Sequence, residues 1–326
     1  LKSFWLKLQG RAFVFCFRLP MSTQLTPNAT FVPSLSQVTS DLVLFAADTP
    51  NSWKPAAVLE ELGVKYDVIL IDLFKDEQKA ADYVKMNPNG RTPTLLDRSM
   101  EPPVPVFESG AICMYLCEKF NAEKPMARQL LPQGPRERSE IMGWLFWQCS
   151  GLGPMMGQIM YMRRIAAPVS LDASKIHFSI ERFHREAVRL LGVLEARLMD
   201  RDYLCGDGDR GSYTLADIAC HGYASSMWWA GIEEGAFLHV SRWLKSLDAR
   251  PAIQASVLVP GISNFGSEGP TFHTLRMDRD LQQKIEQHAT SAGREDLFGW
   301  KDLIEIFKPD AGATPFASHV PASATQ

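Results

Sequence analysis

Between residues 41 and 120, short apolar runs alternate with segments of helical periodicity. The run 42–45 predicts a strand, and after a turn at 48–52 apolar residues recur at helical spacing until Gly63. The other elements predicted here are a strand at 66–73, a helix at 76–86, a hairpin of strands at 94–96 and 104–107, and a helix at 109–120. The first strand-helix-strand unit indicates parallel pairing, whereas the hairpin indicates antiparallel pairing.

Beyond residue 135 the periodicity is helical. Apolar residues three or four apart predict a long helix over 176–198, and Thr214 followed by Asp217 predicts a capped helix start. The uncharged run 141–162 is long enough to span a bilayer. Its polar residues and its Gly-Leu-Gly-Pro sequence predict two buried helices joined at a tight corner instead.

This order of elements predicts an α/β, thioredoxin-like N-terminal domain followed by an all-α C-terminal domain. The basic, acid-free N-terminus is either a disordered segment upstream of a start at Met21 or, if residues 1–20 are a presequence, a mitochondrial signal. The expected divisions are a leader at 1–40, the thioredoxin-like domain at 41–121, a linker at 122–135, the helical domain at 136–262, and a C-terminal extension at 263–326 that is partly helical and then disordered.

Composition narrows the classes of function. The net charge of -3 argues against a nucleic-acid binder and against a surface that seeks anionic membranes. Six cysteines form no C-x-x-C pair, which favours a reducing compartment and a cytoplasmic protein. The seven histidines form no metal-ligand motif, so we expect no metal.

The segment Thr49-Pro50-Asn51 lies where the first predicted strand meets a helix. A hydroxyl, an amide and a helix N-terminus converge there, and all can donate hydrogen bonds to an anion. An ordinary turn with an N-cap would use the same residue types. A thioredoxin has C-x-x-C at this place, so this protein would need a thiol from its ligand.

Two further segments suit the same ligand. In a thioredoxin-like fold a proline such as Pro93 is cis, and it turns the backbone of Thr92 outward to pair with an extended peptide. Glu108 can hold an ammonium, while Ser109 at a helix start can hold a carboxylate. Both charges together describe an α-amino acid end, although Ser109 could also serve only as a helix cap. Together with the missing thiol, these features describe a site for a small peptide that has a free α-amino acid end and a thiol, and glutathione fits that description.

These motifs continue in an order that identifies a family. Residues 41–260 resemble a glutathione transferase, and more narrowly the nu-class bacterial enzymes and the fungal nitrogen-catabolite repressor with its relatives. The motifs are Thr49-Pro50-Asn51, Asn87-Pro88-Asn89-Gly90-Arg91-Thr92-Pro93, Phe107-Glu108-Ser109-Gly110-Ala111-Ile112, Arg136-Glu137-Arg138, Trp144-Leu145-Phe146-Trp147-Gln148, Gly151-Leu152-Gly153-Pro154-Met155, Gly157-Gln158, Ile180-Glu181-Arg182-Phe183 and Leu215-Ala216-Asp217-Ile218-Ala219.

The resemblance implies roles for individual residues. Thr49 and Asn51 would face the glutathione sulfur, and Ser52, where the family has glycine, adds a second hydroxyl. The choice among these three as the group that stabilises the thiolate stays open. The other implied glutathione contacts are Gln78, Thr92, Pro93, Glu108, Ser109 and Arg182. Arg182 would contribute to the site, either in its own chain or across a homodimer interface, unless it is a solvated residue on a long helix.

The resemblance also implies an enzyme that uses glutathione as co-substrate and no metal. Because the thiolate is the nucleophile, it could attack a small electrophile, as in detoxification, or a disulfide. The run Ile159-Met160-Tyr161-Met162 would make the second-substrate pocket apolar and pliable. The alternatives are a non-catalytic regulator that binds a partner protein and a dedicated biosynthetic-pathway transferase.

Overall fold

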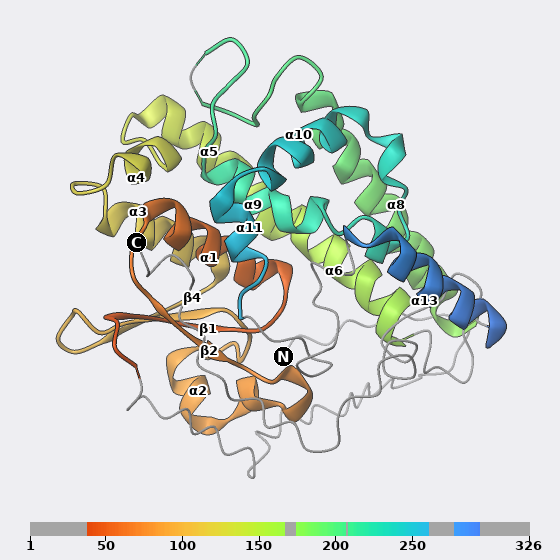
Figure 1. The fold of residues 1–326 in the computed structure, drawn as a ribbon, viewed down its shortest axis with the longest axis horizontal. Helices are drawn as coiled ribbons and strands as arrows, with labels where there is room; N and C mark the ends of the chain where they lie inside the picture. The colour runs from red at the N-terminus through yellow and green to blue at the C-terminus, as the bar shows by residue number, and fades with distance from the viewer. Residues whose placement is uncertain (1–37, 167–173, 207, 261–276, 294–326) are drawn as a thin grey trace, which may run out of the picture.

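A mixed four-stranded sheet forms the centre of the N-terminal domain (Figure 1). The computed structural model describes residues 38–166, 174–206, 208–260 and 277–293. The strands are β1 (Leu42–Ala46), β2 (Asp67–Leu70), β3 (Thr94–Asp97) and β4 (Val104–Phe107). Their order is β2-β1-β3-β4, with β1 parallel to β2 and antiparallel to β3, and with β3 and β4 paired as a hairpin. The predicted α/β architecture and pairing are confirmed.

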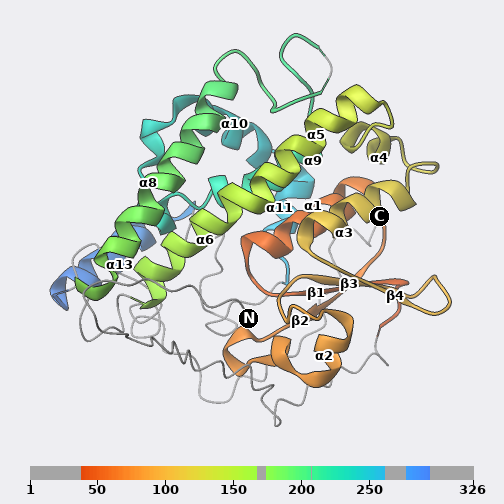
Figure 2. The same ribbon diagram turned by 180° about the vertical axis from the view of Figure 1, so that it is seen from behind.

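Strand β1 is buried on both faces because helices cover the sheet from both sides. Leu42 and Leu44 belong to the large core that α1 (Pro50–Leu62) and α3 (Ser109–Lys119) share with the helical domain. Val43 and Phe45 point the other way, into a small core with Tyr83 of α2 (Ala81–Met86). Figure 2 shows α1 and α3 between the sheet and the helical domain, with α2 on the opposite face.

The segment before α2 differs from the prediction of one helix at 76–86. Strand β2 ends at Leu70, and two 3-10 turns follow, at Leu73–Lys75 and Glu77–Lys79. Asp76 takes a left-handed φ of 56° and Ala80 an extended ψ of 142°, so regular helix begins only at Ala81. This irregular stretch carries Gln78 to the site described below.

The rest of the described chain is mainly helical, as predicted, apart from its connections, one of which carries an isolated β-bridge between Cys205 and Ser212. Helix α9 (Leu215–Ala224) is buried along its whole length and packs between α1, α5 (Pro135–Trp147) and α6 (Gly153–Tyr161). The helices are α4 (Pro125–Leu130), α5 (Pro135–Trp147), α6 (Gly153–Tyr161), α8 (Ser174–Arg197), α9 (Leu215–Ala224), α10 (Leu238–Asp248), α11 (Pro251–Ser256) and α13 (Arg279–Ser291), with 3-10 turns at Trp228–Ala230 and Glu234–Ala236 and a π-helical turn at Met162–Ala166.

Two helices lie in divisions of the chain that were predicted to be outside the two domains. Helix α4 lies inside the segment predicted as a linker, at 122–135. Helix α13 lies within the predicted C-terminal extension, at 263–326. The remaining expectations for that extension, and nearly all of those for the leader at 1–40, fall outside the described residues.

The prediction of a tight corner within 141–162 is wrong. Helix α5 continues through a π-helical turn at Gln148–Leu152 directly into α6, and the two follow one course in Figure 2. Pro154 stands in the first turn of α6, and the wider π-helical turn precedes it, so its missing N–H does not break the helix. In the described ranges, no helix combines the length and apolarity that a bilayer crossing requires.

The start of α9 is held by the predicted capping box. The Asp217 carboxylate is completely buried and accepts hydrogen bonds from the backbone N–H groups of Thr214 and Leu204, both at 3.0 Å, and from Trp243 Nε1 at 2.9 Å. The carboxylate therefore ties three segments of the helical domain together.

Asp217→Ala is expected to lower the free energy of unfolding by about 3 kcal/mol, because it leaves buried donors unpaired. Urea denaturation measures the loss. The matched control is Asp209→Ala, at an exposed position, which should change stability by less than about 0.5 kcal/mol. Equal losses in the two variants would contradict this role of Asp217.

Candidate functional site

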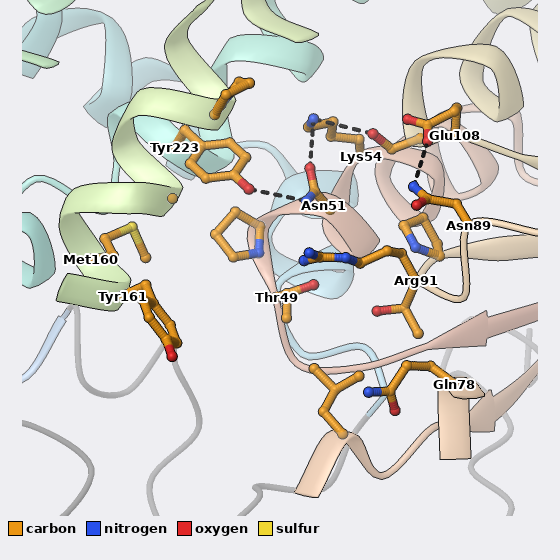
Figure 3. A pocket seen from close by; sticks show the side chains of 18 of the residues that line it. Thr49, Asn51, Lys54, Gln78, Asn89, Arg91, Glu108, Met160, Tyr161 and Tyr223 are labelled. Atoms are coloured by element: carbon orange, nitrogen blue, oxygen red, sulfur yellow. Dashed lines mark hydrogen bonds between the residues drawn. The ribbon is translucent and has the colours of Figure 1, made fainter. Parts of the chain in front are cut away.

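A cavity of about 900 Å³ lies where the N-terminal domain meets α6 and α9 (Figure 3). The start of α1, the loop before β3 and the start of α3 form one wall, and α6 forms the other. The predicted site residues that line it are Thr49, Asn51, Gln78, Thr92, Pro93, Glu108 and Ser109. Seven of the nine predicted residues are thus brought together. Ser52 and Arg182 do not line the cavity.

The peptide bond between Thr92 and Pro93 is cis. The side chains beneath it hold the loop: Asn87 Nδ2 donates to the Arg91 carbonyl at 2.7 Å and to Thr94 Oγ1 at 3.0 Å. Tyr83 adds a hydrogen bond from its hydroxyl to the same carbonyl at 2.8 Å. The backbone of Thr92 is therefore held at the cavity wall by buried polar side chains.

Glu108 introduces α3 with a left-handed φ of 69°, which is uncommon for a residue other than glycine. Its carboxylate is exposed, and Asn89 Nδ2 donates to Oε1 at 3.3 Å. Ser109 follows at the first helical position, is nearly buried, and lines the same cavity. An anionic group and a helix N-terminus thus lie side by side, as the chemistry of an α-amino acid end requires.

Asn51 lies at the centre of a hydrogen-bond network that crosses between the domains. Its Oδ1 accepts from Lys54 Nζ at 3.0 Å, and its Nδ2 donates to the hydroxyl of Tyr223, on α9, at 3.0 Å. Burial raises the pKa of Tyr223 to about 12, so the phenol keeps its proton at neutral pH. The dashed lines in Figure 3 mark these bonds.

Lys54 is the unexpected member of this network. It is 2% exposed, and its ammonium donates to Asn51 Oδ1, to Ser109 Oγ at 3.2 Å and to Gln148 Oε1 at 2.8 Å. The ammonium also lies 5.4 Å from the centre of the Tyr223 ring. Burial lowers the pKa of Lys54, because removal from water disfavours the charged form.

Sequence reasoning gave no role to four residues of this wall: Lys54, Gln148, Cys149 and Tyr223. Two signals were present. Lys54 is a single cation within an otherwise apolar stretch of helix, and Gln148 is polar within the uncharged run 141–162. Cys149 carries a thiol whose pKa is raised by partial burial, an effect that the nearby charge of Lys54 opposes.

The hydroxyl of Ser52 faces the protein interior. Ser52 is completely buried, and its Oγ accepts from the Ala47 backbone N–H at 3.2 Å and lies 3.3 Å from Thr49 Oγ1. The bond to Ala47 joins the end of β1 to the first turn of α1. Ser52 therefore supports the turn that carries Thr49.

Ser52→Ala is expected to leave the affinity for glutathione within about twofold while costing about 1 kcal/mol of stability, since it removes a buried hydrogen bond but no cavity group. Calorimetry and thermal unfolding measure the two effects. A tenfold loss of affinity in a variant that stays folded would instead place Ser52 among the ligand-binding groups.

The far end of the cavity is apolar. Met160 and Tyr161 of α6 line it together with Ile165 and Trp229, and Figure 3 shows the two α6 side chains across from Thr49 and Arg91. This agrees with the apolar, Met-containing pocket expected from the run Ile159-Met160-Tyr161-Met162. Among the described residues, no group of three or more His, Cys, Asp or Glu could hold a metal ion.

Arg182 lies exposed on α8, outside the cavity of its own chain. Phe178, one helical turn earlier, is 78% exposed. This face of α8 is therefore open in the described part of a single chain.

Comparisons with known proteins agree with this geometry. The model of the glutathione S-transferase N-terminal domain matches residues 40–118. The chain is 35% identical to the disulfide-bond oxidoreductase YghU of Escherichia coli (strain K12), over 78% of this chain and 85% of the relative.

Solved structures of glutathione transferases are also similar to this chain. A glutathione transferase from Phanerochaete chrysosporium in complex with oxidized glutathione is 33% identical, with a TM-score of 0.58, over 66% of this chain and 94% of that one. A glutathione transferase homolog from Lodderomyces elongisporus with two glutathione molecules per subunit is 30% identical, with a TM-score of 0.61, over 68% and 100%. Together with the mixed sheet and the cis proline, these likenesses show that the chain belongs to the glutathione transferase family.

Proposed function

We propose that the cavity binds glutathione and stabilises its thiolate for attack on a disulfide or an electrophilic carbon. The observation that carries the proposal is the arrangement of two sets of polar groups along one wall. Glu108 and Ser109 suit the γ-glutamyl end, while Thr49 and Asn51 lie at the N-terminus of α1. The disulfide-bond oxidoreductase relative and the relative with bound oxidized glutathione support the same chemistry.

Thr49 and Asn51 would donate to the sulfur. Thr92, beside cis Pro93, would pair with the cysteinyl backbone, and Gln78 would also contact glutathione. Hydrogen bonds to the sulfur favour the thiolate, whose ordinary thiol pKa is near 8.5. Neither Thr49 nor Asn51 needs to remove the proton, because solvent accepts it at neutral pH.

Disulfide reduction then proceeds by two exchanges. The bound thiolate attacks one sulfur of the substrate disulfide, forms a mixed disulfide and releases a thiolate that takes up a proton. A second glutathione thiolate attacks the mixed disulfide and releases the other thiol, leaving oxidized glutathione. Two glutathione molecules are oxidized for each disulfide reduced.

Conjugation is the second candidate, and the apolar end of the cavity favours it. Met160, Tyr161, Ile165 and Trp229 offer a surface for a bulky apolar electrophile beside the proposed sulfur position. In that reaction the thiolate forms a bond to carbon. Either the bond from that carbon to a leaving group breaks and the group departs with the electron pair, or the thiolate adds to a double bond and the substrate takes up a proton. Conjugation of this kind would serve detoxification or a biosynthetic pathway.

We extend the proposal to the assembly and the compartment. The open face of α8 with Arg182 would meet a second copy in a homodimer, so that Arg182 completes the partner's site. The cysteines of the described chain are free, which suits the reducing cytoplasm.

A coupled assay tests the function. The protein is supplied with glutathione, 2-hydroxyethyl disulfide, glutathione reductase and NADPH, and NADPH loss is followed. We expect turnover that depends on the protein and falls in Thr49→Ala. Binding of glutathione without turnover would favour conjugation, and absence of both would overturn the proposal.

A further inference from the structure

The ammonium of Lys54 is buried without a counter-charge. Within the described part of the chain no carboxylate lies within 4.0 Å of its Nζ, and its three hydrogen-bond acceptors are the neutral oxygens of Asn51, Ser109 and Gln148. A buried charge is costly unless an opposite charge compensates it. The cavity that these acceptors line is where such an anion would enter.

The same three bonds determine which way the acceptors face. Since Asn51 Oδ1 accepts from the ammonium, the amide must direct Nδ2 elsewhere, and one of its two N–H groups reaches Tyr223. Since Ser109 Oγ accepts from the ammonium, the hydroxyl proton must point away from Lys54. Gln148 Oε1 is the third acceptor, and its buried Nε2 lies against Gly153, where an added Cβ would be 2.6 Å from it, with no hydrogen-bond partner in the described part of the chain.

We propose that Lys54 is a positioning residue: its buried charge balances the thiolate of bound glutathione, and its hydrogen bonds to Asn51 and Ser109 turn the donors of these two residues toward the ligand. This inference rests on the proposed function. Lys54 would act on both ends of the ligand from behind the cavity wall. It would act on the sulfur through Asn51 and on the γ-glutamyl end through Ser109.

The other titratable groups around Lys54 do not supply the missing negative charge. Cys113, Cys149 and Cys220 lie near it, and burial raises the pKa of each thiol, so they are neutral at pH 7. The phenol of Tyr223 is also neutral. Glu108 acts on Lys54 only from beyond ion-pair distance and is exposed to solvent.

The test uses the full chain and glutathione itself. Ultraviolet absorbance of the thiolate is titrated against pH for glutathione bound to wild type, Lys54→Met and the control Lys65→Met, which removes an exposed charge just beyond α1. We expect a thiol pKa below about 8.5 in wild type and in the control, and a rise of about 1 unit in Lys54→Met, a tenfold smaller thiolate fraction near neutral pH.

A double-mutant cycle separates positioning from support of the fold. If Lys54 acts through Asn51, then Lys54→Met should change the thiol pKa much less in an Asn51→Ala background than in wild type. Binding of S-methylglutathione, which forms no thiolate, should weaken less than binding of glutathione at a pH above the wild-type thiol pKa. Should Lys54→Met not fold, Lys54→Gln, which is neutral but keeps polar contacts, takes its place.

The outcomes distinguish the proposed role of Lys54 from the proposed binding of glutathione. An unchanged thiol pKa in a folded Lys54→Met or Lys54→Gln variant overturns the role of Lys54 and leaves glutathione binding by wild type intact. Absence of glutathione binding in wild type overturns the proposed function itself.

Discussion

Asn51→Ala is expected to lower kcat/KM for glutathione-dependent turnover by about a hundredfold, the loss usual when one preorganised donor to a developing anion is removed. Asn51 donates to Tyr223 and accepts from Lys54, and its second N–H is available to the sulfur. The variant loses that donor and at the same time releases both neighbours. The coupled assay with saturating disulfide measures the loss, and circular dichroism confirms that the variant is folded.

Tyr223→Phe is a smaller change to the same hydrogen-bond network. Tyr223→Phe keeps the ring over which Lys54 lies and removes only the hydroxyl that accepts from Asn51. Its effect on kcat/KM should be about tenfold, because Asn51 stays in place through its bond to Lys54. A larger loss in Tyr223→Phe than in Asn51→Ala would show that the phenol, and not the amide, donates to the sulfur.

Glu108→Gln is expected to raise the Kd for glutathione by about 30-fold, because it removes the negative charge proposed to hold the γ-glutamyl ammonium; this equals about 2 kcal/mol. The amide keeps the size of the side chain and its capacity to accept from Asn89. Calorimetric titration with glutathione measures the change.

The ligand offers the matching control for Glu108. An analogue of glutathione without the α-amino group should bind wild type and Glu108→Gln with nearly equal affinity, since the charge then has no partner in either complex. Glu101→Gln, at an exposed position outside the cavity, should behave as wild type. If Glu108→Gln weakened both ligands equally, the carboxylate would be acting on the backbone at the start of α3 and not on the ammonium.

The sheet and its pairing could be predicted because local patterns determine them. The apolar run of β1, Gly63 at the end of α1 and the paired strands β3 and β4 are short-range signals. Thr92-Pro93 and Glu108-Ser109 could be singled out for the same reason, since each motif adjoins a strand or helix end. Their meeting in one cavity follows from the order of the strands.

The path of the chain through 141–162 could not be predicted from local rules. Glycine and proline close together ordinarily end a helix, but the π-helical turn at Gln148–Leu152 accommodates Pro154. Gly153 leaves room that this turn uses, because a Cβ there would lie 2.6 Å from Gln148 Nε2. Only the packing within the helical domain, where Gln148 and Tyr223 surround Gly153, reveals why this position is small.

The network around Asn51 was also beyond sequence reasoning. Tyr223 lies 172 residues from Asn51 along the chain, and Gln148 lies 94 from Lys54, so no spacing links them. For Ser52 the residue type alone suggested a thiolate donor, whereas the side-chain direction, inward to Ala47, depends on the turn after β1. Arg182 stays a proposal that involves a second subunit.

Calorimetric titration of the wild-type protein with glutathione at pH 7 tests the central claim most directly. The account predicts saturable binding at one cavity per chain, weakened by Glu108→Gln and unchanged by Glu101→Gln. Absence of saturable binding at millimolar glutathione in a folded protein would contradict it.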